Sequence, residues 1–378
     1  MTDRPAIIVV AYSVRALASS AAHAGFAPLS IDVFGDDDMR ETSLASVKLS
    51  GGLSDGLKLD QMLGAVERLI GAYAPIGLVY GAGFEHQPET VAAIALETRV
   101  FGNDAETLKR AKDPIALARM CDTNSVRHPR VQFAPPDDPE LWLVKRQGGA
   151  GGAHIAAAHG VSRASPECYF QRRVAGRSIS ALFLASARRA EIIGLSMQWT
   201  APTPASPFRY GGAAGPVDVG RTQAEEIARA VAAMTSDLDL VGLNSADFLV
   251  SDDAVWLTEI NPRPGATLDV FDSYDDPLFA RHVAACEGRL TPMPPALAFK
   301  AAEIVYAPCD IVIREQCDWP DWAVDRSSPG TRVAAGEPLC TALASGVTLD
   351  LARMCVGERA QKIIALVQET EPCAISGA

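Results

Sequence analysis

Short apolar runs alternate with amphipathic stretches over the first 120 residues. Residues 6–10, 26–34 and 76–80 are apolar runs of strand length. Residues 13–25, 89–98 and 106–121 have the spacing of helices, and the first of these ends at Gly25. Strands that alternate with helices predict a parallel α/β sheet.

The pattern changes after the Pro- and Asp-rich segment 134–139. Strands are predicted at residues 141–145, 153–157, 168–173, 179–185, 190–198, 244–250 and 255–260, with one helix at 223–238. This order predicts an antiparallel sheet with a supporting helix, an α+β layout. Residues 301–347 again have strand and turn character, and residues 349–368 form an amphipathic helix.

Length and pattern together predict three domains. Residues 1–102 form an α/β domain, residues 103–298 form an α+β domain with lobes 103–175 and 176–298, and residues 299–378 form a strand-rich subdomain with a closing helix. With 48% hydrophobic and 21% charged residues, the chain is expected to fold throughout.

Composition narrows the partners and the compartment. The formal charge of −12 repels polyanions, so we expect no nucleic-acid partner. No run approaches the ~20 apolar residues of a membrane span, and the start lacks the features of a secretory signal, so we expect a cytoplasmic protein without a membrane partner. The eight cysteines form no CxxC pair and are expected to be reduced thiols.

The first domain lacks the signature of a dinucleotide-binding unit. Residues 11–16, directly after the first strand, contain no glycine of a G-x-G-x-x-G motif. Without those glycines, Asp32 at the end of the second strand is interpreted as a surface or capping carboxylate. We therefore expect this domain to shape the substrate side.

Oxygen ligands gather on two predicted neighbouring strands. Glu259 and Asn261 are two residues apart and point to the same face of one strand, and Asp247 on the other strand can reach that face. Two carboxylates and an amide are suited to Mg²⁺, and Arg263 can pair with a phosphate. The alternative is a solvated strand end, which the combination E-x-N-P-R-P disfavours.

A lysine and four glycines follow another strand. Lys145 precedes Gly148, Gly149, Gly151 and Gly152, whose backbone can approach a polyphosphate closely. G-K-[ST] is missing, so this is a glycine lid rather than a Walker loop, and the alternative is a flexible hairpin loop.

Two further segments complete the candidate site. Residues 168–180 join a strand to a short linker, whose backbone groups can read an adenine ring. Residues 206–212 are expected to be a mobile loop in which Arg209 holds a carboxylate or acyl phosphate; the alternative is a surface arginine.

With these segments in this order, the chain resembles the ATP-grasp superfamily, which includes D-alanine:D-alanine ligase, biotin carboxylase and glycinamide ribonucleotide synthetase. The resemblance spans residues 101–269, and the α/β domain matches the family's preceding domain. It implies that Asp247, Glu259 and Asn261 bind the metal and that Arg263 binds phosphate. The nucleotide-binding residues that it implies are Lys112, Lys145, Gly148, Gly149, Gly151, Gly152, Gln171, Arg173, Val174 and Ser178.

Three of these positions depart from the family pattern. Gln171 stands where many members have a glutamate at the adenine hinge, for which Arg173 and Val174 would supply the backbone. Ser178 replaces the usual ribose-binding glutamate, and Lys112 precedes an aspartate that the family's basic residue usually follows.

The resemblance implies a carboxylate-amine ligase that forms an amide through an acyl phosphate. It would use ATP and Mg²⁺, or Mn²⁺ in its place, act on small-molecule carboxylate and amine substrates, and rely on Arg263, Lys145 and Arg209 for catalysis. The chain also looks like the branch near one-carbon cofactor genes that includes the tyramine-glutamate ligase of methanofuran synthesis.

Three alternatives stay open. A carboxylase or a kinase of the same superfamily would fit, although no biotin-carrier motif is present. A nucleotide-binding scaffold without turnover is opposed by the intact metal ligands. A homo-oligomer is compatible with every one of these functions.

Overall fold

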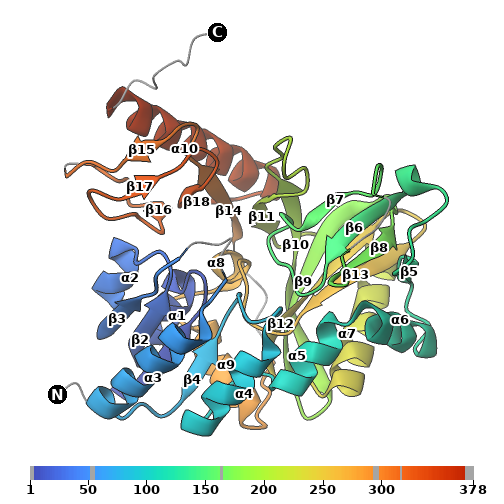
Figure 1. Ribbon diagram of the computed structural model, residues 1–378, viewed down its shortest axis with the longest axis horizontal. Coiled ribbons are helices and arrows are strands. Elements are labelled where there is room, and N and C mark those ends of the chain that lie inside the picture. The colour runs from blue at the N-terminus through green and yellow to red at the C-terminus, as the bar shows by residue number, and fades with distance from the viewer. Residues whose placement is uncertain (1–3, 52–55, 162–164, 293–297, 316, 371–378) are drawn as a thin grey trace.

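The computed structural model describes residues 4–51, 56–161, 165–292, 298–315 and 317–370 (Figure 1). Its N-terminal unit, blue in Figure 1, is a parallel sheet in the order β3-β2-β1-β4 with helices around it. The elements are β1 (Ala6–Val10), α1 (Arg15–His23), β2 (Ala27–Asp32), α2 (Asp37–Thr42), β3 (Ala45–Lys48), α3 (Leu59–Tyr73), β4 (Leu78–Tyr80) and α4 (Pro88–Glu97). β2 and β4 are buried along their whole length, as strands between two helical layers are.

Asp32 at the end of β2 is buried, so its interpretation as a surface carboxylate is wrong. Its Oδ1 accepts the N–H of Gly35 at 2.8 Å, so the carboxylate caps the turn after β2. Gly35 has φ +67° and allows the chain to turn there.

One predicted helix, residues 106–121, is two helices: α5 (Ala105–Lys112) and α6 (Pro114–Thr123). Pro114 has no N–H, and a proline disfavours helical backbone at the residue before it. Asp113 is extended (φ −78°, ψ 113°), and its carboxylate caps α6 by accepting the N–H groups of Ile115 and Ala116. The break makes Lys112 the last residue of α5.

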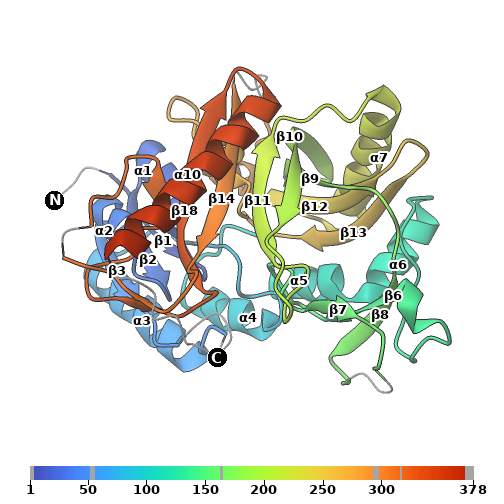
Figure 2. The same cartoon turned by 90° about the horizontal axis from the view of Figure 1, so that it is seen from above.

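The middle of the chain forms two antiparallel sheets. The smaller sheet has the order β5-β8-β6-β7, with β5 (Val131–Gln132), β6 (Trp142–Arg146), β7 (Ile155–Ala157) and β8 (Cys168–Arg172); the 3₁₀ helix η1 (Pro139–Leu141) precedes β6. The larger sheet contains β9 (Arg177–Ser186), β10 (Arg189–Thr200), β11 (Tyr210–Gly215), β12 (Gly242–Val250) and β13 (Val255–Asn261). Figures 1 and 2 show the large sheet between the N-terminal unit and the small sheet.

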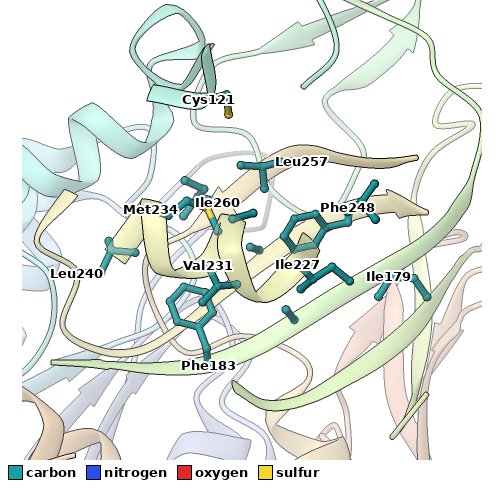
Figure 3. Packing of buried hydrophobic residues seen from close by; sticks show 14 of the residues in the cluster. Cys121, Ile179, Phe183, Ile227, Val231, Met234, Leu240, Phe248, Leu257 and Ile260 are labelled. Carbon is teal, nitrogen blue, oxygen red and sulfur yellow. The ribbon is translucent and has the colours of Figure 1, made fainter. Parts of the chain in front are cut away.

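Alternating residues of β9 bury both faces of the large sheet. On one face, Phe183 and its same-face neighbours pack against α7 (Arg221–Leu238), where Ile227, Val231 and Met234 complete the core in Figure 3. On the other face, Leu182 and Leu184 pack with α9 (Leu278–Cys286) and with α1 of the N-terminal unit. This strand therefore fixes the N-terminal unit against the large sheet.

Three of the C-terminal strands continue the large sheet. The full order is β13-β12-β9-β10-β11-β14-β18-β16, with β14 (Phe299–Tyr306), β16 (Ala323–Val324) and β18 (Pro338–Gly346). A two-stranded sheet of β15 (Ile311–Val312) and β17 (Arg332–Val333) lies beside them, and α10 (Leu349–Thr370) packs on β14 and β18. A one-turn helix, α8 (Leu268–Phe271), follows β13.

Two features of composition are settled by the structure. None of the helices in the described part of the chain is long and apolar enough to cross a membrane. Among the described residues, six cysteines are free thiols, but Cys309 is disulfide-bonded, so the expectation of reduced thiols is wrong at this residue. Cys373 lies outside the described residues. Scattered spacing along the chain does not report which cysteines meet in the fold.

Candidate active site

The pairing of β12 with β13 brings the predicted metal ligands together. Asp247 lies opposite Glu259, and Ser245 lies opposite Asn261. The Asn261 side chain donates to Asp247 Oδ2 at 3.0 Å, and Lys112 Nζ contacts both Glu259 and Asn261, so the three side chains lie on one face. The two-residue spacing of Glu259 and Asn261 was therefore a reliable guide.

Two lysines from other segments face these oxygens. Lys112 Nζ lies 2.6 Å from Glu259 Oε1 and 2.8 Å from Asn261 Oδ1. Lys145, near the end of β6, is only 5% exposed, and the negative charges of Glu259 and Asp247 act to raise the pKa of its ammonium group. Lys112 is thus held at the oxygens by direct contact, and Lys145 is buried close enough for their charges to act on it.

The charges of this cluster shift its pKa values in opposite directions. Burial raises the pKa of Asp247, and the neighbouring Glu259 carboxylate raises it further. Burial would also raise the pKa of Glu259, but Lys112 and Lys145 outweigh it and hold that pKa at about 2. Burial lowers the pKa of Lys145 despite the two acids beside it. Glu259 is therefore the permanent negative charge of the cluster.

The donor set fits a magnesium ion that is completed by other ligands. Within the described residues, no three histidine, cysteine, aspartate or glutamate side chains form a metal-binding group, so the protein alone offers no full shell. Asp247, Glu259 and Asn261 offer hard oxygen atoms on one buried face, and Mg²⁺ commonly takes one or two carboxylates and fills its shell with water and phosphate oxygens.

Arg263 forms a buried ion pair that was not predicted. Its Nε lies 2.7 Å from Glu85 Oε1, and the two side chains are 9% and 1% exposed. Glu85 Oε2 also accepts the N–H of Gly83 at 2.8 Å, and Arg263 lowers the pKa of Glu85 against the effect of burial. Glu85 follows β4, at the carboxyl end of a parallel strand, and that position was the signal for it.

The glycine segment is seated between two parts of the backbone. A Cβ on Gly148 would lie 2.5 Å from the Glu85 carbonyl oxygen, and one on Gly152 would collide with the Phe208 carbonyl oxygen. Gly151 accepts the N–H of Tyr210 at 2.9 Å. The segment thus bridges the N-terminal unit and the loop before β11.

Arg209, predicted to hold a substrate carboxylate, is engaged by the protein itself. Its Nε donates to Ala201 O at 2.9 Å, one terminal nitrogen donates to Gly336 O at 2.8 Å, and its guanidinium lies 3.5 Å from the ring centre of Tyr306. The residue lines the cleft but ties the 201–209 loop to the C-terminal strands.

The predicted adenine segment also lines the cleft. The N–H of Arg173 donates to Leu141 O at 2.8 Å, so it is not free to read a base. Gln171 is 6% exposed and its amide reaches Thr258 O at 3.4 Å, and the Ser178 hydroxyl reaches Gln198 at 3.3 Å. Val174 lies beside them in the cleft.

All of these residues surround one cleft of about 2300 Å³. Its walls come from the N-terminal unit, both central sheets and the C-terminal strands. The structure therefore brings together every predicted site residue, although they are spread from Lys112 to Arg263 in sequence.

Comparison with known proteins gives both a family match and a set of similar folds. Residues 111–267 match a family model described as an ATP-grasp domain. The L-amino acid ligase from Bacillus licheniformis is similar at TM-score 0.68 and 14% identity, over 95% of this chain and 97% of that chain. N5-carboxyaminoimidazole ribonucleotide synthetase from Thermotoga maritima is similar at TM-score 0.67 and 11% identity, over 95% and 98%.

A carboxylase is similar to the same degree. The biotin carboxylase domain of 2-oxoglutarate carboxylase from Hydrogenobacter thermophilus, in complex with MgADP, ADP and bicarbonate, gives TM-score 0.70 at 11% identity, over 93% of this chain and 89% of that chain. No curated protein sequence matches the chain. Identities this low establish similarity of fold alone.

Proposed function

We propose that this chain, which carries an ATP-grasp domain and has the ATP-grasp fold that its sequence predicts, is an Mg-ATP-dependent carboxylate-amine ligase. The observation that carries the proposal is the buried cluster of Asp247, Glu259 and Asn261 with Lys112 and Lys145. Its lysines and oxygen ligands are suited to a triphosphate and its metal.

Each group in this cluster has a role in phosphoryl transfer. A magnesium ion on the acidic face would supply positive charge to the phosphate oxygens. Lys112 would exchange part of its contact with Glu259 for phosphate, and the buried Lys145 would add a second positive charge. The Gly148–Gly152 segment would cover the chain of phosphates with backbone N–H groups. Stabilising the transferring group's charge is how such sites lower the barrier.

The reaction has two balanced steps. A carboxylate oxygen of the first substrate attacks the γ-phosphorus, the bond to the bridging oxygen of ADP breaks, and an acyl phosphate forms. The nitrogen of the amine then attacks the acyl carbon, phosphate leaves, and the nitrogen loses a proton. Arg263, which Glu85 holds beside Asn261, would pair with the anionic oxygens of the acyl phosphate.

Solved proteins of this fold support the cofactors and leave the acceptor to experiment. A ligase and a carboxylase with bound MgADP and bicarbonate are equally similar to this chain. Membership of the tyramine-glutamate ligase branch stays a prediction, as does a role in cofactor synthesis. Mn²⁺ in place of Mg²⁺ is a further prediction.

Hydroxylamine provides the test, because it converts acyl phosphates to hydroxamates. The protein would be incubated with ATP, Mg²⁺, a panel of carboxylates and hydroxylamine, with ADP and hydroxamate measured together. Equal amounts of both are expected from the true substrate, and Lys145→Met should abolish them while Lys58→Met, outside the cleft, should not. ADP formation with bicarbonate alone would indicate a carboxylase instead of a ligase. ADP formation with alcohols, without hydroxamate, would indicate a kinase.

A further inference from the structure

The N-terminal sheet presents its carboxyl edge to the cleft. Tyr12 follows β1, Phe34 follows β2, Lys48 ends β3, and Gly83 follows β4, and all four line the cleft. Ligands of open parallel sheets bind at this edge, beside the strand where the order reverses direction. In the order β3-β2-β1-β4 that strand is β1, next to β4 and the loop that carries Glu85. The edge is therefore placed for a substrate rather than for structure alone.

A wall of the cleft beside this edge comes from the far end of the chain, where Asp38 of α2 accepts the N–H groups of Asp325 and Arg326 at 2.9 Å. Ser327, Thr331 and Arg332 line the same cleft, and Arg332 belongs to β17. The short β15–β17 sheet fixes the backbone there, with Arg332 paired to Val312. A molecule bound at the edge of the N-terminal sheet would thus also meet this wall.

The cleft has a charge opposite to that of the protein. Ten lysine and arginine residues line it against six aspartate and glutamate residues, whereas the whole chain carries 34 basic and 46 acidic residues. Part of this excess serves the phosphates through Lys112, Lys145 and Arg263. Arg172 and Arg209 already have partners in the protein, Asp138 and backbone carbonyl groups respectively, which leaves fewer cations for another anion.

Lys48 and Arg332 are two cations of the cleft lining that have no partner in the described parts of the chain. Both side chains are exposed, and neither forms a hydrogen bond or ion pair there. Burial raises the pKa of Asp32 to about 6, and Lys48 opposes that rise without pairing with it. The nearby acids are engaged: Glu85 by Arg263, and Glu337 by the N–H of Ala334 at 3.0 Å.

The hydrocarbon part of Lys48 has a fixed support. A Cβ on Gly35 would lie 2.8 Å from Lys48 Cδ, so the side chain lies across that glycine. An ordered stem reduces the entropy that a lysine loses when it binds an anion. Lys48 is therefore better placed than a free surface lysine.

We propose that Lys48 and Arg332 bind a second anionic group of the carboxylate substrate, at the end of the cleft between the N-terminal sheet and β17. The substrate would carry its reacting carboxylate near Arg263 and a distal carboxylate or phosphate at these two residues. This inference rests on the proposed ligase function and names the substrate class for the same cleft.

The hydroxamate assay tests it with three kinds of acid: monocarboxylates, dicarboxylates of the same chain length, and carboxylates that carry a phosphate, such as 3-phosphoglycerate. Lys48→Gln and Arg332→Gln should each raise the KM of the preferred diacid roughly tenfold or more, since each removes a charge-assisted hydrogen bond. The KM of ATP should stay unchanged. The class of acid with the lower KM, dicarboxylate or phosphorylated carboxylate, shows whether the distal group is a carboxylate or a phosphate.

Lys58→Gln and Arg314→Gln are matched controls, because both residues are exposed and lie outside the cleft. Monocarboxylates used as efficiently as diacids, or Lys48 and Arg332 variants that behave like the controls, would overturn the inference.

If no acid yields hydroxamate, the ligase proposal fails by itself. The anion site is then decided by calorimetric titration of glutarate and 3-phosphoglycerate into the protein with ADP and Mg²⁺. Binding that is lost in Lys48→Gln and kept in Lys58→Gln supports the site, and absent or equal binding refutes it.

Discussion

Closure of the glycine segment over the cleft can be tested with two neighbouring alanine substitutions. Gly151 and Gly152 have φ values of +67° and +75°, so alanine at either position is forced into the left-handed region. A Cβ on Gly151 would meet no atom within 4 Å, whereas one on Gly152 would collide with the carbonyl oxygen of Phe208. The pair therefore separates backbone strain from the loop contact.

The expected magnitudes follow from these two terms. Left-handed backbone costs an alanine about 1–2 kcal/mol, and both variants bear it. Overpacking adds about 1–3 kcal/mol at Gly152 alone, because Phe208 belongs to the backbone and must move with its loop. At about 1.4 kcal/mol for each factor of ten, Gly152→Ala should be roughly 5- to 150-fold slower than Gly151→Ala.

The assay is single-turnover ADP formation with saturating ATP, Mg²⁺ and substrate. Hydrogen exchange of residues 147–153 should be faster in Gly152→Ala than in Gly151→Ala when nucleotide is bound, since the loop no longer seats on Phe208. Equal rates and equal exchange in the two variants would refute the view that this contact closes the cleft.

Three further outcomes are expected. Glu259→Gln should lower the rate of ADP formation by about 100-fold or more. It should also lower the melting temperature, because Lys112 and Lys145 are then buried without that negative charge. A wild-type rate in the folded variant would show that Glu259 is not part of the site. Removing divalent metal with EDTA should shrink the rise in melting temperature that ATP causes, and an unchanged rise would contradict a shared metal-nucleotide site. Burial is the main cause that raises the pKa of Asp36 to about 8 from its ordinary value of 3.8, and the nearby Asp325 and Asp32 add to it. The folded protein therefore binds this proton more tightly than the unfolded chain, and the free energy of unfolding should fall as pH rises from about 4 to 8. Asp36→Asn should flatten this pH dependence in thermal melts, and an unaltered dependence would disprove the assignment.

Sequence predicted best what depends on neighbouring residues. The two-residue period placed Glu259 and Asn261 on one face of β13, and the structure keeps them there. The same reasoning located β9, β10, β12 and β13 within a few residues of their bounds. It missed β11, because residues 206–212 were expected to be a mobile loop and the strand begins at Tyr210. It did not reveal that β14 pairs with β11, because that register joins Gly212 to Glu303 and leaves no trace in the local pattern.

Contacts between distant segments explain what was missed at the site. Glu85 and Arg263 are 178 positions apart, and each taken alone resembles an ordinary charged residue. Pro114 in the sequence indicates a helix break, but the apolar spacing continues across it and predicts one helix instead of two. That break decides where Lys112 ends up, 2.6 Å from a carboxylate 147 positions later.

The glycines between Lys145 and β7 show how one composition can have two causes. Their number suggested a backbone that approaches a polyphosphate, but at three of the four a Cβ would collide with the protein itself. Gly148 packs against the backbone at Glu85, Gly149 against the ring of His154, and Gly152 against Phe208, while Gly151 alone faces open space. Glycine content by itself is therefore weak evidence for phosphate binding here. The contacts of Glu85 say more about how the site is built, because its backbone packs against Gly148 and its side chain pairs with Arg263. The closed position of the segment and the orientation of the arginine thus depend on one residue of the N-terminal unit, outside the part of the chain that the ATP-grasp model matches.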